Sequence, residues 1–336
     1  MKDIINWGIL GPGVIAGEFA RCLRELPDAR VAAAGSRDMA RARAYCDKYG
    51  GKPYGSYEEL VNDPGVDIIY VATLHHLHEE HTILALRAGK HVLCEKPIAV
   101  NEASAARMYA EAEKRNLFLM DGLWSRFFPA WEFVKKYIGG GELGRIVAIN
   151  SITSWGVTEF NMKPRLFHPE LAGGALLDGG IYSLAATTLM LGVDEYPTSI
   201  KALTEMGQTR VDDHDGVVMQ FPSGIIVTIL AGLQGPLLVT HILCENGVVT
   251  IPNHRNPQNV EVNLYSKYGG LYGMEGRNYR FPYKESGFQF EAAHVHECLR
   301  NGLTESPRVT KKESLTLMRI ADEIRRQAGF VYPFET

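Results

Sequence analysis

The sequence has few cysteines, no long hydrophobic run and no excess of charge of either sign. Its 5 cysteines among 336 residues are scattered and form no CxxC pair, which argues against a disulfide framework and predicts reduced thiols in a cytoplasmic protein. No stretch of about 18 apolar residues suggests a membrane span, and the short apolar run near the N-terminus lacks the pattern of a signal peptide. A formal net charge of −4 gives no field that would gather nucleic acid or an anionic membrane. The expected partner is therefore a small molecule.

Alternating strand and helix patterns fill the first third of the chain. The composition, 46% hydrophobic and 22% charged, is typical of a globular protein, and the length favours two domains. Up to residue 122, short apolar runs alternate with helix-period segments, which indicates an α/β domain with a doubly wound parallel sheet of the Rossmann type. The predicted strands are 4–10, 30–35, 67–73, 91–95 and 117–121, and the predicted helices are 14–26, 38–49, 56–62, 77–88 and 101–115.

After residue 122 the pattern becomes rich in strands. Residues 123–336 are expected to form an α+β domain with a large, mostly antiparallel open sheet. The predicted strands are 145–155, 199–206, 214–221, 224–232, 237–244, 247–251 and 259–266, with helices near 127–138, 174–191, 288–301 and 311–328. Because only one face of this sheet is needed for its own helices, the other face is predicted to form a homodimer. The acidic run Asp212-Asp213-His214-Asp215 is interpreted as a solvated turn.

A glycine-rich turn follows the first predicted strand. Gly11-Pro12-Gly13-Val14-Ile15-Ala16 is a G-x-G-x-x-A sequence, in which two glycines permit a tight turn and the close approach of a pyrophosphate to a helix N-terminus. The alternative is a tight strand-to-helix turn without a ligand. The position between a strand and a helix favours a dinucleotide site.

The end of the second predicted strand indicates which dinucleotide is bound. Ser36-Arg37 stands where NAD-binding proteins carry an acidic residue for the ribose, and Arg41 lies one helical turn further on. A hydroxyl group and two guanidinium groups suit a 2′-phosphate, so NADP is predicted over NAD. Asp38 argues against this assignment, and the alternative is that both arginines belong to a solvated helix start.

Two further segments carry groups suited to proton transfer. Lys96, in Glu95-Lys96-Pro97, follows the fourth strand at the sheet edge where ligands of such folds bind, and it could stabilise a developing alkoxide. Asp178 and Tyr182 are four residues apart, so in a helix they share one face, and a nearby ammonium group would favour the phenolate form of the tyrosine. The alternatives are a solvated lysine, a helix-capping Asp178 and a core Tyr182.

A metal site is not predicted, although histidines cluster after the third strand. His75, His76, His78 and His81 match no HExxH spacing. Arg165 could contact the cofactor or the substrate, or lie at the surface.

Together these segments resemble the glucose–fructose oxidoreductase/inositol dehydrogenase/MocA family. The resemblance rests on the glycine-rich turn, on Glu95-Lys96-Pro97 and on Gly173-Gly174-Ala175-Leu176-Leu177-Asp178-x-Gly180-Ile181-Tyr182. Leu123-Trp124-Ser125-Arg126-Phe127-Phe128-Pro129-Ala130 and the final tyrosine are similar to the family's dimeric dihydrodiol dehydrogenase branch, whose members also act as NADP-linked D-xylose dehydrogenases. Most of the family has a histidine in place of Tyr182, and a bulkier residue in place of Gly179.

The resemblance implies roles for particular residues. Lys96, Asp178 and Tyr182 would form the catalytic group and contact the substrate, with either Tyr182 or Lys96 as the proton carrier. Trp124 and Phe127 would line the nicotinamide and substrate cleft. The residues implied to contact the cofactor are Gly11, Gly13, Val14, Ile15, Ser36, Arg37, Arg41, Thr73, Leu74, His75, His78, Glu95, Lys96, Trp124 and Arg165.

The sequence therefore predicts an NADP-dependent oxidoreductase. Hydride would pass between the nicotinamide and a hydroxyl-bearing carbon of a pentose-like sugar or a trans-dihydrodiol. The alternative is a sensor of the same fold that binds NADP without turnover, although a sensor needs no proton carrier.

Overall fold

The computed structural model describes residues 4–157, 164–265 and 274–335. Two compact units make up the chain: unit 1 comprises Met1–Trp124 and Lys284–Met318, and unit 2 comprises Ser125–Tyr283 and Arg319–Thr336. The first boundary lies two residues from the predicted one. The prediction that 123–336 form a single domain differs from this division, because 284–318 pack with unit 1.

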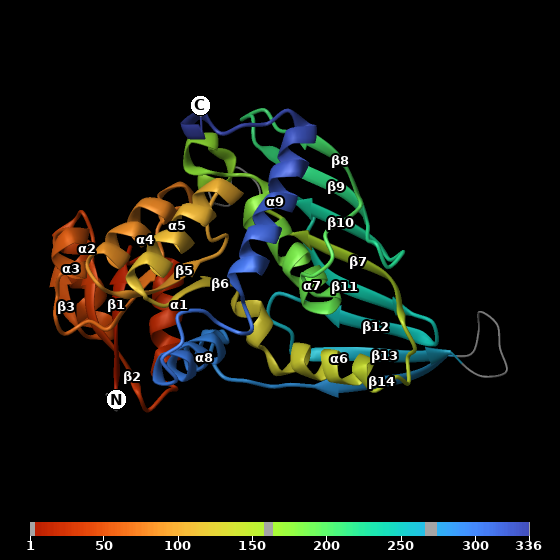
Figure 1. Cartoon of the computed structure of the whole chain (residues 1–336), viewed down its shortest axis with the longest axis horizontal. Helices are drawn as coiled ribbons and strands as arrows, with labels where there is room; N and C mark the ends of the chain where they lie inside the picture. The colour runs from red at the N-terminus through yellow and green to blue at the C-terminus, as the bar shows by residue number, and fades with distance from the viewer. Residues whose placement is uncertain (1–3, 158–163, 266–273, 336) are drawn as a thin grey trace. The chain divides into compact units, whose positions relative to one another are not determined.

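Unit 1 is the predicted Rossmann domain (Figure 1). Its sheet has six strands in the order β3-β2-β1-β4-β5-β6, and every adjacent pair is parallel. The strands are β1 (Ile5–Leu10), β2 (Ala29–Gly35), β3 (Lys52–Tyr54), β4 (Ile68–Val71), β5 (His91–Glu95) and β6 (Leu119–Gly122). The helices between them are α1 (Val14–Leu23), α2 (Met39–Tyr49), α3 (Tyr57–Val61), α4 (His78–Arg87) and α5 (Glu102–Arg115). The α/β class is confirmed, and only the three-residue β3 was not predicted.

A late segment of the chain completes unit 1. Helix α8 (Phe288–Arg300) brings His296 to β1, where Nε2 of His296 accepts a hydrogen bond from Nε1 of Trp7 at 3.0 Å. The other ring nitrogen of His296 lies 3.1 Å from Oδ2 of Asp28. The indole of Trp7 is fully buried, so this bond satisfies a donor that has no access to water.

Unit 2 is built on an eight-stranded sheet in the order β14-β13-β12-β11-β7-β10-β9-β8. All adjacent pairs are antiparallel except β10 and β7, which are parallel. The strands are β7 (Ile146–Ser154), β8 (Ser199–Met206), β9 (Asp212–Gln220), β10 (Ile226–Gly232), β11 (Leu237–Cys244), β12 (Gly247–Pro252), β13 (Asn259–Tyr265) and β14 (Met274–Arg280). The mostly antiparallel sheet is thus confirmed. Strand β14 was missed because its sequence does not alternate apolar and polar residues.

Helices cover one face of this sheet (Figure 1). They are α6 (Pro129–Gly139), α7 (Ile181–Leu191) and, from Arg319 onward, α9 (Lys311–Ala328). One helical stretch, Pro169–Leu191, is long and apolar enough to cross a membrane, but 83% of its most apolar part is buried inside the protein. That burial is typical of a core helix.

Candidate active site

The turn between β1 and α1 fits a dinucleotide pyrophosphate. Gly11 has φ +89, and a Cβ atom there would lie 2.7 Å from Cγ2 of Thr73, so only glycine suits the position. Helix α1 begins without a side-chain cap or an acidic residue in its first turn, which leaves its N–H groups for an anion. Val14 and Ile15 in that turn are 83% and 46% exposed.

The side chains after β2, where the sequence predicts a 2′-phosphate site, lie at the start of α2. Ser36 is buried, and its hydroxyl accepts a bond from the N–H of Asp38 at 3.2 Å. The carboxylate of Asp38 caps α2 by accepting from the N–H of Ala40 at 2.8 Å. Asp38 is therefore the N-cap of α2. Arg37 and Arg41 are exposed.

One of the histidines after β4, His78, contacts the backbone on both sides of its ring. His78 is fully buried, with Nδ1 2.8 Å from the carbonyl oxygen of Pro97 and Nε2 3.2 Å from that of Thr73. Burial lowers the pKa of His78 to about 4, so the ring is neutral at physiological pH. Among the described residues, no group of three or more metal-ligating side chains is placed to hold an ion. The predicted cofactor contacts of Thr73, Leu74, His75 and His78 stay predictions.

Lys96 directly follows the carboxyl end of β5, as predicted. The neighbouring Glu95 is 7% exposed; it accepts a hydrogen bond from the hydroxyl of Tyr70 and, through Oε2, one from the N–H of Lys96 at 3.1 Å. The Lys96–Pro97 peptide is cis. Glu95 and His78 thus hold the two sides of the turn that presents Lys96.

The predicted wall residues lie in different units. Trp124 of unit 1 is 5% exposed and stacks on Phe288, with ring centroids 4.3 Å apart. Phe127 of unit 2 is 3% exposed. Their roles beside nicotinamide and substrate stay predictions.

Asp178 and Tyr182 lie at a junction between two kinds of helix in unit 2. Residues Leu176–Gly180 form a π-helical turn, which continues into α7, so the predicted helix 174–191 is not uniform. Such turns are rare and are frequently found at functional sites. Asp178 and Tyr182 are 3% and 4% exposed.

Arg165 forms an ion pair with Asp178. Nη2 of Arg165 lies 2.5 Å from Oδ1 of Asp178, and the two side chains are 30% and 4% exposed. A buried carboxylate needs such a partner to stay ionised. Asp178 is therefore not the helix cap considered as an alternative, and the structure places Arg165 beside it; the contact of Arg165 with the cofactor stays a prediction.

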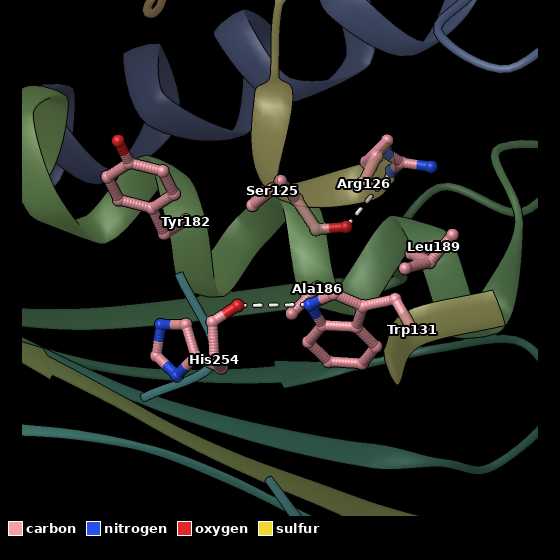
Figure 2. A pocket seen from close by; sticks show the side chains of 8 residues that line it. Ser125, Arg126, Trp131, Tyr182, Ala186, Leu189 and His254 are labelled. Atoms are coloured by element: carbon pink, nitrogen blue, oxygen red, sulfur yellow. Dashed lines mark hydrogen bonds between the residues drawn. The ribbon is translucent and has the colours of Figure 1, made fainter. Parts of the chain in front are cut away.

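Tyr182 lines a small pocket within unit 2. Figure 2 shows its ring at one side of the pocket, with the hydroxyl pointing away from Trp131 and His254. Nε1 of Trp131 donates to the carbonyl oxygen of His254 at 3.0 Å, and Nη2 of Arg126 donates to that of Ala185 at 3.0 Å. These bonds fix the pocket walls. The ring of Trp155 lies edge-on to that of Tyr182, with centroids 6.1 Å apart.

A buried polar network lies behind this pocket and was not predicted from the sequence. Nε2 and Nδ1 of His254 lie 3.0 and 3.1 Å from the hydroxyls of Thr153 and Thr240, and burial lowers the pKa of His254 to about 4. Ser151 and Ser183 continue the network, 2.9 Å apart. The hydroxyl residues at alternate positions of β7 are the signal that could have indicated it.

The acidic run on β9 was misinterpreted. Asp212 and Asp215 are 3% and 1% exposed, so they belong to the buried face of a strand and not to a solvated turn. Oδ2 of Asp212 accepts from the N–H of Leu176 at 2.6 Å, which ties β9 to the π-helical turn.

The fold and these sites define an NAD(P)-dependent oxidoreductase. Residues 5–123 match the model of the oxidoreductase family with an NAD-binding Rossmann fold, and residues 131–250 match the GFO/IDH/MocA C-terminal domain. The chain belongs to the GFO/IDH/MocA family of oxidoreductases, as the resemblance indicated.

Curated relatives align along the whole chain. A trans-1,2-dihydrobenzene-1,2-diol dehydrogenase from Mus musculus is 36% identical over 333 residues, which is 98% of each chain. The enzyme of that name from Homo sapiens is 35% identical and covers 98% of each chain. Among solved structures, an aldose-aldose oxidoreductase from Caulobacter crescentus, complexed with glycerol, has a TM-score of 0.85 and 28% identity, covering 97% of this chain and 98% of that one.

Proposed function

We propose that the protein is an NADP-linked dehydrogenase of a pentose-like sugar or a trans-dihydrodiol. The curated relatives are named as dihydrodiol dehydrogenases, and a similar solved structure is named as an aldose oxidoreductase. Both names describe oxidation or reduction at hydroxyl-bearing carbons. When bound, the nicotinamide ring accepts or donates the hydride.

The observation that carries this proposal is the ion-paired carboxylate of Asp178 on the same helical segment as Tyr182. Held by Arg165 at 2.5 Å, Asp178 is an acceptor that orients a substrate hydroxyl. Tyr182, in its phenolate form, takes the hydroxyl proton and becomes the neutral phenol as hydride leaves the carbon, and the ammonium of Lys96 stabilises the negative charge on both oxygens. In the alternative assignment, Lys96 carries the proton and Tyr182 orients the substrate.

A substrate panel tests the function. Purified protein is mixed with NADP⁺ and either D-xylose or a trans-dihydrodiol, and reduced nicotinamide is followed by its absorbance. Turnover that is lost in Tyr182→Phe but retained in part in Lys96→Met assigns the proton to Tyr182, and the reverse assigns it to Lys96. NADPH binding without turnover on any sugar, diol or dicarbonyl would establish the sensor instead.

The preference for NADP is proposed from Arg37 and Arg41. Arg37→Asp should weaken NADPH binding by about 10²-fold, since it replaces a charge-assisted partner of the 2′-phosphate with a repelling group. Arg43→Asp is the matched control, because Arg43 is also exposed, lies on α2 two residues after Arg41 and undergoes the same charge change. Equal NADPH dissociation constants for the two variants would contradict the assignment.

A homodimer through the open face of the unit 2 sheet is also proposed. Strand register places six exposed apolar side chains of β8, β9, β10 and β11 on one face. They are Leu203 at 85% exposure, Leu237 at 49%, Val218 at 46%, Leu230 at 42%, Ile226 at 37% and Leu243 at 36%. Exposed apolar patches of this kind commonly mark interfaces. Sedimentation should show a dimer that Leu230→Glu dissociates and the control Leu303→Glu, in unit 1, does not; a monomeric parent protein would contradict the proposal.

A cytoplasmic location is proposed from the state of the cysteines. All five, Cys22, Cys46, Cys94, Cys244 and Cys298, are free and buried, which suits a reducing compartment. Fractionation of the source cells tests this, and recovery from the extracellular medium would contradict it.

A further inference from the structure

Two carboxyl groups on β9, those of Asp212 and Asp215, are 3% and 1% exposed, and each affects the pKa of the other. One oxygen of each is bonded elsewhere, since Oδ2 of Asp212 accepts from the N–H of Leu176 and Oδ1 of Asp215 accepts from the hydroxyl of Thr204, both at 2.6 Å. The remaining oxygens, Oδ1 of Asp212 and Oδ2 of Asp215, accept no hydrogen bond from any described residue. A single proton between the two carboxyl groups would satisfy both.

An irregularity of β9 creates this pair. Residues three apart in a regular strand point to opposite faces of the sheet. Here Glu205 pairs with His214 and Met206 pairs with Asp212, so Asp213 is the extra residue of a bulge. Bulges re-aim side chains and occur often beside active sites. The bulge turns Asp212 to the buried face that Asp215 already occupies.

The pair supports the segment that carries Asp178 and Tyr182. Asp212 bonds the N–H of Leu176, the first residue of the π-helical turn. Gly174, at φ +117, packs so closely that a Cβ atom there would lie 1.9 Å from Oδ1 of Asp212. The hydroxyl of Tyr332 donates to the carbonyl oxygen of Gly173 at 2.7 Å. The turn therefore begins at a point that Asp212 and Tyr332 hold.

We propose that Asp212 shares one proton with Asp215 and is a positioning residue, which sets the places of Asp178 and Tyr182 through the N–H of Leu176. The inference rests on the proposed function because it assigns the chemistry to those two residues. Without the shared proton, two adjacent buried carboxylates would repel each other and the bond to Leu176 would lose its fixed geometry.

The surroundings favour retention of the proton at neutral pH. Burial and the charge of Asp215 raise the pKa of Asp212 well above its usual range, and burial raises the pKa of Asp215. The titratable groups that interact with the pair are His214 on β9 and Tyr332 after α9. Tyr332 in turn interacts with Glu335 and with Arg325 on α9, whose guanidinium lies 5.1 Å from the Tyr332 ring. Burial raises the pKa of Tyr332 well above its usual value, so the pair is expected to lose its proton before Tyr332 does, as pH rises.

Two variants of Asp212 separate positioning from packing. Asp212→Asn keeps an oxygen for Leu176 and offers an N–H donor to Asp215, so it imitates the protonated pair; we expect kcat within about twofold of the parent. Asp212→Leu removes the acceptor, and kcat should fall roughly 10- to 100-fold, as for a small misplacement of catalytic groups. The dissociation constant for NADPH should stay unchanged in both, since the predicted cofactor contacts on unit 1 are untouched. Glu205→Gln, on the neighbouring strand and 73% exposed, is the control.

The pH profile provides the readout that a merely structural role would not change. In the parent protein kcat should fall at alkaline pH as the shared proton leaves, and in Asp212→Asn that fall should move to higher pH. Identical alkaline profiles for parent and Asp212→Asn, or parental kcat in Asp212→Leu, would overturn the proposal. If Asp212→Leu does not fold, the dependence of kcat on pH in Asp212→Asn alone tests the proposal.

Infrared spectroscopy tests the shared proton without any substrate. The carbonyl stretching band of a buried protonated carboxyl group should be present at neutral pH and should lose intensity in Asp212→Asn but not in Glu205→Gln. An unchanged band overturns the proposal even in an active enzyme. If the band behaves as expected but the protein shows no turnover, the two carboxyl groups share a proton and only the proposed function is wrong.

Discussion

The guanidinium of Arg165 donates to the carboxylate of Asp178 across 2.5 Å, and this pair determines the charge of the proposed site. Replacing Arg165 with Met leaves an almost buried carboxylate without its cation, which should cost about 2 kcal/mol of stability and lower kcat/KM roughly 10- to 100-fold. Arg165→Lys should recover part of the loss, since it keeps the charge but not the planar fork.

The matched control for this pair is Arg145→Met. Arg145 pairs with Glu245 at 2.7 Å but is 83% exposed, and exposed pairs contribute less than about 1 kcal/mol. Denaturant unfolding and steady-state kinetics measure both variants. Equal losses of stability and of kcat/KM in Arg165→Met and Arg145→Met would show that Arg165 has no role in the site.

His78 predicts that unit 1 becomes less stable in acid. Burial lowers the pKa of His78 from 6.5 to about 4, so below 6.5 the unfolded chain binds a proton that the folded protein does not. The free energy of unfolding should therefore fall as pH decreases from 6.5 toward 4, by about 2 kcal/mol near pH 5 from this residue. His78→Asn should show a smaller decrease in denaturant titrations, and the exposed His168→Asn should match the parent.

Glu291 should make the free energy of unfolding depend on pH in the opposite direction, with stability lost as pH rises. Its side chain is fully buried on α8, and burial, with the charges of Glu95 and Asp121, raises its pKa well above 4.5. The unfolded chain releases this proton above 4.5 while the folded protein keeps it, so stability is lost as pH rises, by up to about 1.4 kcal/mol per pH unit. Glu291→Gln should abolish this loss in unfolding experiments at several pH values. Glu297→Gln on the same helix, 72% exposed, should not.

The bond between Trp7 and His296 predicts a strong coupling between the first strand and α8. His296→Phe leaves the buried indole N–H without its acceptor and should destabilise unit 1 by about 2 kcal/mol or more. Trp7→Phe alone removes the donor, and in the double variant the second change should cost less than it does alone. Strictly additive free energies in the double-mutant cycle would show that the bond contributes nothing.

Local patterns were enough to predict most of the fold, because each strand and helix carries its own periodicity. Strands 199–206 and 237–244 and helix 311–328 agree with the structure to the residue. Strand β14 could not be predicted, since Met274–Arg280 owes its conformation to pairing with β13 and not to its own sequence. For the same reason, nothing local indicates that α8 packs on β1, 289 positions away from Trp7.

The candidate site was predicted as a set of residues but not as an arrangement. The family motif indicated Asp178 and Tyr182, whereas the π-helical turn depends on a bond from Leu176 to Asp212 on a distant strand. Asp212 and Asp215 were assigned to solvent because acidic residues in a run are usually exposed. The burial of Asp212 follows from a bulge, and a bulge is set by the register of the neighbouring strand.

Because each unit is assembled from two separated stretches of chain, synthesis on the ribosome cannot finish either one early. The Rossmann sheet emerges first yet lacks α8 until residue 300 has left the exit tunnel, so the nascent sheet must wait through the translation of some 160 intervening residues (125–283). Tyr332, which anchors the turn before Asp178, is made 159 residues after its partner Gly173. The proposed catalytic segment therefore stays unanchored until Tyr332 has been synthesised.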